Sequence, residues 1–92
     1  MAMHPGRQMT LHQMKIGQTG TVIGALGGRG LIRRLEALGI RPGKRMIKIS
    51  STPFRGPVTL RVGSTQVAVG FGMANRIIVE VDKYLREGPV TR

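Results

Sequence analysis

The sequence predicts a small, mainly β domain, a barrel or a sandwich, with a short α-helix inserted after the first strand. Short segments rich in β-branched residues recur at a spacing of roughly ten residues, which is typical of antiparallel all-β domains. A Gly-Ser pair at 63–64 separates two such segments and indicates a tight hairpin. The segment 31–38 differs, because its apolar residues recur at helical spacing. Closure into a barrel removes exposed sheet edges, and we therefore favour the barrel.

The elements are expected to follow one another closely along the chain. Thr10 and Gln13 have the pattern of a capping box, which indicates a helical turn that ends at Gly17. Gly39 favours a left-handed C-cap after the helix, and Pro42 stops any continuation. The expected elements are a flexible tail at 1–9, the turn at 10–17, strands at 19–26, 44–50, 58–62, 65–70 and 77–82, the helix at 31–38, a proline-rich turn at 52–57, a helical turn at 73–76 and an extension at 84–92. One domain therefore spans residues 10–83.

Aliphatic side chains and methionines must fill the core, because aromatic residues are scarce. The expected core positions are Leu11, Met14, Ile16, Leu31, Ile32, Leu35, Leu38, Met46 and Met73. A methionine surface for a soft metal is the alternative, but methionine commonly fills gaps in small cores.

The charge of the chain is strongly unbalanced. Lys and Arg number 15 and Asp and Glu number 4, which gives a formal net charge of +11. Such an excess attracts polyanions, whether nucleic acid, an anionic membrane surface or an acidic protein face. Few acid–base pairs can form from these carboxylates and two histidines, and no Asp lies near either histidine in sequence. We therefore expect no enzymatic activity.

Cysteine is absent, which excludes disulfides and thiolate chemistry and is consistent with a reducing compartment. No apolar run approaches the roughly 20 residues that span a bilayer, and residues 1–10 lack the apolar segment of a signal peptide. We therefore expect a cytoplasmic protein, and association with the inner face of the membrane stays open. Met1, Met3 and Met9 leave the starting residue open as well.

Two glycine-rich segments come close to nucleotide-binding motifs but lack essential residues. Residues 28–33 match the dinucleotide fingerprint until Arg33, which replaces the glycine needed for close packing of helix on strand. Residues 39–45 are one residue shorter than a phosphate-binding loop, and Arg45 replaces the hydroxyl that binds magnesium. We therefore expect the glycines to serve turns and helix ends.

His4 and His12 are the only imidazoles, and neither has a carboxylate nearby in the sequence. A zinc site needs three or four converging ligands. We therefore expect no cofactor and no metal site, and an adventitious metal bound between molecules is the open alternative.

Cations cluster around the predicted helix. The cluster comprises Arg29, Arg33, Arg34, Arg41, Lys44 and Arg45. A solvated charged face is the simplest interpretation, but so many cations beside so few anions predict a positive binding patch. Stacking on single-stranded nucleic acid requires more aromatic residues, and duplex readout requires a longer helix. A protein or membrane-surface partner is therefore favoured, with nucleic acid second.

The chain as a whole resembles the FeoA family, ferrous iron transport protein A. The resemblance lies in successive blocks: LHQMKIGQTGTV, LIRRLEALGIRPGKRMIKI, TPFRGPVTLRVGSTQVAV and MANRIIV. The pair Arg34–Leu35 followed by LGIRPG is typical of the family, as are PFRGP and the run from Ala74 to Val79. Together these blocks extend from Thr10 to Asp82 and cover nearly the whole domain.

The resemblance implies an SH3-like β-barrel with the helix after the first strand. Family members are small cytosolic accessories of FeoB, the membrane ferrous-iron transporter with a G-protein domain, and similar domains occur in metal-dependent transcriptional repressors. The resemblance therefore implies an adaptor that binds the FeoB-type transporter and modulates ferrous iron uptake. A basic nucleic-acid-binding β-barrel and a regulatory SH3-like domain of a metal-dependent regulator stay as alternatives. A weak homo-oligomer is also open.

Docking on a transporter assigns a role to specific side chains. Arginine binds carboxylate or phosphate through two parallel hydrogen bonds, and the helix region would thus meet acidic side chains or lipid phosphates. Phe54, at a hairpin tip, is either an apolar anchor for the partner or a core residue that covers the end of the barrel. The candidate partner-binding residues are Arg29, Arg33, Arg34, Arg41, Pro53 and Phe54.

Overall fold

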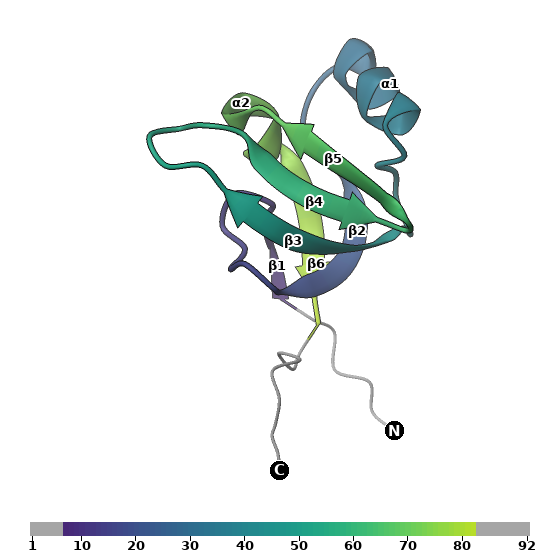
Figure 1. The fold of residues 1–92 in the computed structure, drawn as a ribbon. Helices are drawn as coiled ribbons and strands as arrows, with labels where there is room; N and C mark the ends of the chain where they lie inside the picture. Colours follow the sequence, from purple (N-terminus) through teal and green to yellow (C-terminus); the bar gives the residue numbers. More distant parts are fainter. Residues whose placement is uncertain (1–6, 83–92) are drawn as a thin grey trace, which may run out of the picture.

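The computed structural model describes residues 7–82, which form a six-stranded antiparallel sheet and two short helices (Figure 1). The elements are β1 (Arg7–Thr10), β2 (Thr19–Ala25), α1 (Arg29–Ala37), β3 (Arg45–Ser51), β4 (Val58–Val62), β5 (Thr65–Val69), α2 (Phe71–Ala74) and β6 (Ile77–Val81). The strands are ordered β1-β6-β2-β3-β4-β5, and every neighbouring pair is antiparallel. The mainly β class is confirmed, and the parallel βαβ unit of a dinucleotide site does not occur in these residues.

The sheet is open, whereas the sequence favoured a closed barrel. β1 and β5 are the two edges, and no strand pairing joins them within residues 7–82. The segments next to these edges do meet, because the His12 N–H donates to the Ala74 carbonyl of α2 at 3.2 Å. The two edges are thus linked through a turn and a helix, not through a continuous ladder.

Strand β1 was missed in the sequence. Residues 7–9 were expected in the flexible tail, but Arg7 lies opposite Val81 and Thr10 lies opposite Ile78 in a regular ladder with β6. Met9 is half-buried against the core. The helix therefore follows the second strand of the chain and not the first. Residues 1–6, and the extension expected at 84–92, lie outside the described residues.

The core lies on the inner face of the sheet, where alternate side chains of the strands are buried. Its members are Leu11, Met14, Val22, Leu35, Ile40, Met46, Val58, Leu60, Val62, Val67, Val69, Ala74, Ile77, Val79 and Val81. Leu31, Leu38 and Met73 pack against this core while partly exposed, but Ile16 is exposed and does not join it. At Gly20, an added Cβ would lie 2.6 Å from the Glu80 carbonyl oxygen, so β2 requires glycine where it meets β6.

Two end signals of the sequence are confirmed in atomic detail. The Thr10 N–H donates to the Gln13 side chain at 2.9 Å, and the Gln13 N–H donates to the Thr10 hydroxyl at 3.2 Å, which is a reciprocal capping box. At the end of α1, the Ile40 N–H donates to the Leu35 carbonyl and the Gly39 N–H to the Glu36 carbonyl, both at 2.9 Å. With Gly39 at φ +89°, this is a Schellman motif.

Lys48 is the one charged residue that is buried among the described residues, at 3% exposure. The pleat of β3 turns it inward beside Met46. The ammonium group donates to the carbonyls of His12, at 3.0 Å, and Met14, at 2.7 Å. Burial lowers the pKa of Lys48. The side chain thereby ties the connection between β1 and β2 to the inside of the sheet.

Candidate partner-binding site

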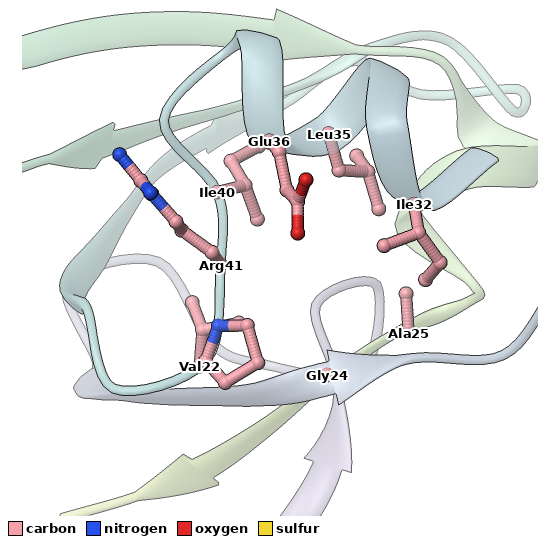
Figure 2. A pocket seen from close by; sticks show the side chains of 9 residues that line it. Val22, Gly24, Ala25, Ile32, Leu35, Glu36, Ile40 and Arg41 are labelled. Carbon is pink, nitrogen blue, oxygen red and sulfur yellow. The ribbon is translucent and has the colours of Figure 1, made fainter. Parts of the chain in front are cut away.

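A small apolar cavity of about 100 Å³ lies between α1 and β2. We call it the α1–β2 cleft, and Figure 2 shows side chains of α1 pointing across it toward β2. Its lining comprises Val22, Gly24, Ala25, Ile32, Leu35, Glu36, Ile40, Arg41 and Pro42. Only Glu36 and Arg41 in this set are charged, and both are exposed. The cleft therefore combines an apolar interior with charge at its rim.

The local sequence explains why this space is left unfilled. β2 presents Gly24 and Ala25 to the helix, and side chains this small cannot fill the gap. A Cβ added at Gly24 would meet no heavy atom within 4 Å. On the helix side of the cleft, the Schellman motif at Gly39 folds Ile40 back toward Leu35. The side chains of both residues therefore line the cleft.

The four candidate arginines of the helix region lie together around α1, and all are exposed. None of them forms an ion pair with another residue in the range 7–82. The helical period places Arg29 and Arg33 on the same side as Glu36, and places Arg34 on the side turned away from the cleft. Arg41 lines the cleft itself. We call Arg29, Arg33 and Arg41 the cationic rim. Glu36 is the one carboxylate of the cleft lining and lies on the same side of α1 as Arg29 and Arg33, whereas Arg34 lies on the opposite side.

Arg45, which the sequence groups with these cations, is engaged elsewhere. Its guanidinium makes two hydrogen bonds to the Asp82 carboxylate, at 2.9 and 2.6 Å, and a third to the Thr21 hydroxyl at 3.0 Å. The Thr19 hydroxyl also donates to Asp82. The hydrogen bonds that the Asp82 carboxylate accepts raise the pKa of Arg45. This cation therefore links β2 and β3 to the end of β6 and contributes little free charge.

Pro53 and Phe54 do not join the helix region. They belong to the connection between β3 and β4, residues 52–57, which we call the β3–β4 tip. In Figure 1 the tip projects from the left of the sheet, whereas α1 lies at the upper right. Phe54 is 97% exposed, so its assignment as a core residue covering the barrel is wrong. The six residues expected to form one surface therefore lie on two separate regions.

The β3–β4 tip has a defined conformation despite its exposure. The Thr52 N–H donates to the Pro57 carbonyl at 3.0 Å and closes the loop at its base. Phe54 and Arg55 both have positive φ values, 61° and 65°. The Arg55 guanidinium lies over the ring of Phe71, 5.8 Å from its centroid, and His12 packs edge-on against the same ring at 4.7 Å. The tip is thus fastened to α2 and to the turn after β1.

The described residues offer no geometry for metal binding. No group of three or more His, Asp and Glu side chains within residues 7–82 is placed to hold an ion. His12 packs on Phe71, while His4 lies outside the described residues. No helix in this range has the length and apolar character to cross a bilayer.

Comparison with known proteins places the fold in a wider group. A manganese-dependent transcriptional repressor matches with a TM-score of 0.75 at 23% identity, over 83% of this chain and 42% of that one, which shows a shared fold. Stenotrophomonas maltophilia FeoA complexed with zinc, described as a procaryotic SH3 domain protein, matches with a TM-score of 0.65 at 27% identity, over 77% of this chain and 88% of that one. No protein among the curated sequences matches the chain.

A crystal structure of the iron uptake regulatory protein FeoA is 32% identical to this chain, with a TM-score of 0.76. The match covers 82% of this chain and 99% of the other. Residues 9–81 match the model of the FeoA domain, a range that begins in β1 and ends with β6. The resemblance seen in the sequence blocks is therefore confirmed, and the chain belongs to the FeoA family.

Proposed function

We propose that this protein is an accessory factor of ferrous iron uptake that binds the cytosolic side of a FeoB-type membrane transporter. Membership of the FeoA family supports this role, and the Stenotrophomonas maltophilia relative is described as a candidate activating factor of ferrous iron transport. The proposed activity is recognition of another protein and involves no catalysis. The docking surface consists of the α1–β2 cleft and its cationic rim.

The cleft is the observation that carries this proposal. Its apolar volume, about 100 Å³, is smaller than the roughly 150 Å³ of an apolar cavity that accommodates benzene. An aliphatic side chain such as Leu or Val suits a space of this size. A side chain anchored in a desolvated pocket contributes strongly to binding energy, whereas the exposed contacts around it contribute less.

The cationic rim specifies the kind of segment that carries the side chain. Arg29, Arg33 and Arg41 surround the cleft without carboxylate partners of their own among residues 7–82. An acidic segment supplies those partners, and the planar guanidinium group can bind each carboxylate through two hydrogen bonds. The proposed ligand is thus an acidic segment of the transporter with one aliphatic residue at its centre.

The test is binding of the transporter's cytosolic domain to the variant R33E/R41E. We expect the affinity to fall at least about tenfold, and the remaining binding to depend less on salt, because charge complementarity is reversed at the rim. The variant R7E/R61E changes the net charge equally on β1 and β4, and should bind nearly as the unmodified protein does. R34E should have a smaller effect than R33E, since Arg34 faces away from the cleft.

Equal loss of affinity in R33E/R41E and R7E/R61E would contradict the proposed surface, because binding would then follow net charge alone. Both variants should fold, since exposed side chains without ion pairs contribute little to stability. Generic RNA is tested in the same assay. Salt-sensitive RNA binding at micromolar affinity, with no binding of the transporter domain, would favour the nucleic-acid alternative.

A further inference from the structure

From the β3–β4 tip we infer a second binding site, for an anionic membrane surface. In this arrangement the Phe54 ring enters the boundary between lipid headgroups and acyl chains, while cations of the protein bind lipid phosphates. The inference concerns the lipid bilayer itself and does not depend on docking to a transporter. It assigns a role to the two candidate residues that the fold separates from α1, Pro53 and Phe54.

Phe54 is far more exposed than any other large apolar side chain of the described residues. Its exposure is 97%, against 63% for Ile16 and 62% for Leu26. Burial of a phenylalanine side chain is favourable, and full exposure therefore leaves this free energy available for binding. The tip projects outward from the sheet (Figure 1), so the side chain is presented to a partner that can surround it.

The backbone of the tip keeps the ring in this exposed position. Positive φ values are unfavourable for residues other than glycine, and here two consecutive residues, Phe54 and Arg55, adopt them. The Thr52–Pro57 hydrogen bond and the contact of Arg55 with Phe71 hold this conformation from both sides. Strained backbone of this kind persists where the surrounding structure enforces it, often at functional sites.

The charge around the tip favours an anionic partner. Neither the tip nor the strands β3 and β4 on either side of it contain an Asp or Glu residue, whereas Arg55 and Arg61 lie in this stretch and are exposed. The whole chain carries a formal net charge of +11. Each Lys or Arg near an anionic membrane adds to the attraction, so this charge concentrates the protein at such a surface.

The shape of the tip favours a bilayer over a folded protein as its occupant. A protein partner needs a pocket matched to Phe54, whereas the interfacial region of a bilayer yields around any aromatic side chain that is pushed into it. Aromatic side chains beside cations are typical of segments that lie in the membrane interface. Phe54 with Arg55 has this combination in two adjacent residues.

The test uses Phe54→Trp, which introduces the only tryptophan of the chain. The variant is mixed with vesicles of phosphatidylcholine and phosphatidylglycerol, and separately with vesicles of phosphatidylcholine alone. We expect a blue shift of tryptophan emission, and quenching by lipids brominated near the headgroup, with the anionic vesicles only. Added salt should reverse both changes, since it screens the attraction of the cations to the lipid surface.

Sedimentation with the same anionic vesicles provides the second measurement. We expect Phe54→Ala to partition about fivefold more weakly, because the variant has no ring to transfer out of water. The matched control Leu26→Ala removes another exposed apolar side chain, at the end of β2, and should partition like the unmodified protein. The side chains of Phe54 and Leu26 are both exposed, so neither variant should alter the fold.

Three outcomes would overturn the inference. The protein does not sediment with anionic vesicles; or it sediments while the tryptophan at position 54 keeps its solvent-exposed emission, so that another face makes the contact; or the emission shifts only when the transporter's cytosolic domain is added without lipid. The last result identifies a protein anchor. None of these outcomes bears on whether the α1–β2 cleft binds the transporter, because the rim variants test that separately.

Discussion

The α1–β2 cleft and the β3–β4 tip both bring apolar surface next to cations, but they do so with opposite shapes. The cleft is concave, and small residues of β2 beneath an amphipathic helix leave its interior unfilled. The tip is convex, and a strained backbone presents a single ring on it. A concave site selects a ligand by size, whereas a convex site needs a partner whose surface can deform around it. The two partners that we propose would therefore contact separate regions of the molecule.

The two regions also differ in what holds them. The cleft is built on the core itself, because Leu35 and Ile40 line it and are buried at the same time. The tip depends on contacts at the surface, through Arg55 and Phe71 to His12. His12 in turn belongs to the connection that Lys48 secures from inside the sheet. Perturbation near Lys48 should therefore reach the tip more readily than the cleft.

The largest expected effect is that of Lys48→Ala, which should lower the free energy of unfolding by about 3 kcal/mol. The substitution leaves a cavity and two carbonyls, of His12 and Met14, without their donor. Urea denaturation monitored by circular dichroism measures the loss. In the remaining native protein, hydrogen exchange should accelerate around residues 11–17 and in the tip more than in α1.

Lys48→Met is the matched control, since it keeps most of the side-chain volume and removes the buried charge. It should cost less than Lys48→Ala, because methionine leaves little cavity, although the carbonyls of His12 and Met14 still lose their donor. If Lys48→Ala unfolds at the same urea concentration as the unmodified protein, the buried ammonium does not secure the connection between β1 and β2. The proposed difference in what stabilises the cleft and the tip would then be wrong.

Gly24→Val should separate the two regions by function. The backbone at Gly24 does not require glycine, and a Cβ there meets open space, so the added side chain should fill part of the cleft. We expect the free energy of unfolding to stay equal or rise by up to about 1 kcal/mol, because valine favours strands. Affinity for the transporter's cytosolic domain should fall about tenfold, as for loss of an anchoring contact.

Vesicle binding by Gly24→Val should remain as in the unmodified protein, because the tip is untouched. A Gly24→Val variant that binds the transporter domain normally would show that the cleft does not accept a partner side chain, even if the rim variants still weaken binding. Isothermal titration and vesicle sedimentation on the same preparation give both values.

Phe54→Gly should raise the free energy of unfolding by about 1 kcal/mol, a smaller change than the loss expected for Lys48→Ala. Glycine adopts positive φ without strain, and the ring it replaces makes no buried contact. The same variant should lose vesicle binding to at least the extent of Phe54→Ala. A gain in stability together with that loss would show that the tip keeps its conformation at the expense of stability.

Local signals in the sequence were sufficient for most of the fold. The strand at 58–62 and the hairpin at 63–64 have the expected bounds, because their alternation and turn residues are explicit. The capping box at Thr10 and the C-cap at Gly39 were likewise recognisable, since each depends on residues only a few positions apart. The cations around α1 were found from composition, and their binding role stays a prediction.

What the sequence did not reveal depends on contacts between distant residues. β1 is four residues long and largely polar, and it exists because β6, some seventy positions later, offers an edge. Lys48 is buried because two carbonyls from another segment satisfy it. The cleft arises where Gly24 and Ala25 of β2 lie opposite α1. Neither residue carries a local signal in the sequence that predicts a cleft.

The pairing of β1 with β6 brings the two ends of the domain together, since Arg7 lies directly opposite Val81. A unit whose entry and exit are neighbours can be joined to other sequences at either side with little disturbance to its interior. The same architecture occupies 42% of the length of a manganese-dependent repressor, where further sequence is attached to it. Adjacent ends thus make this fold portable, as a free-standing protein or as one module among several.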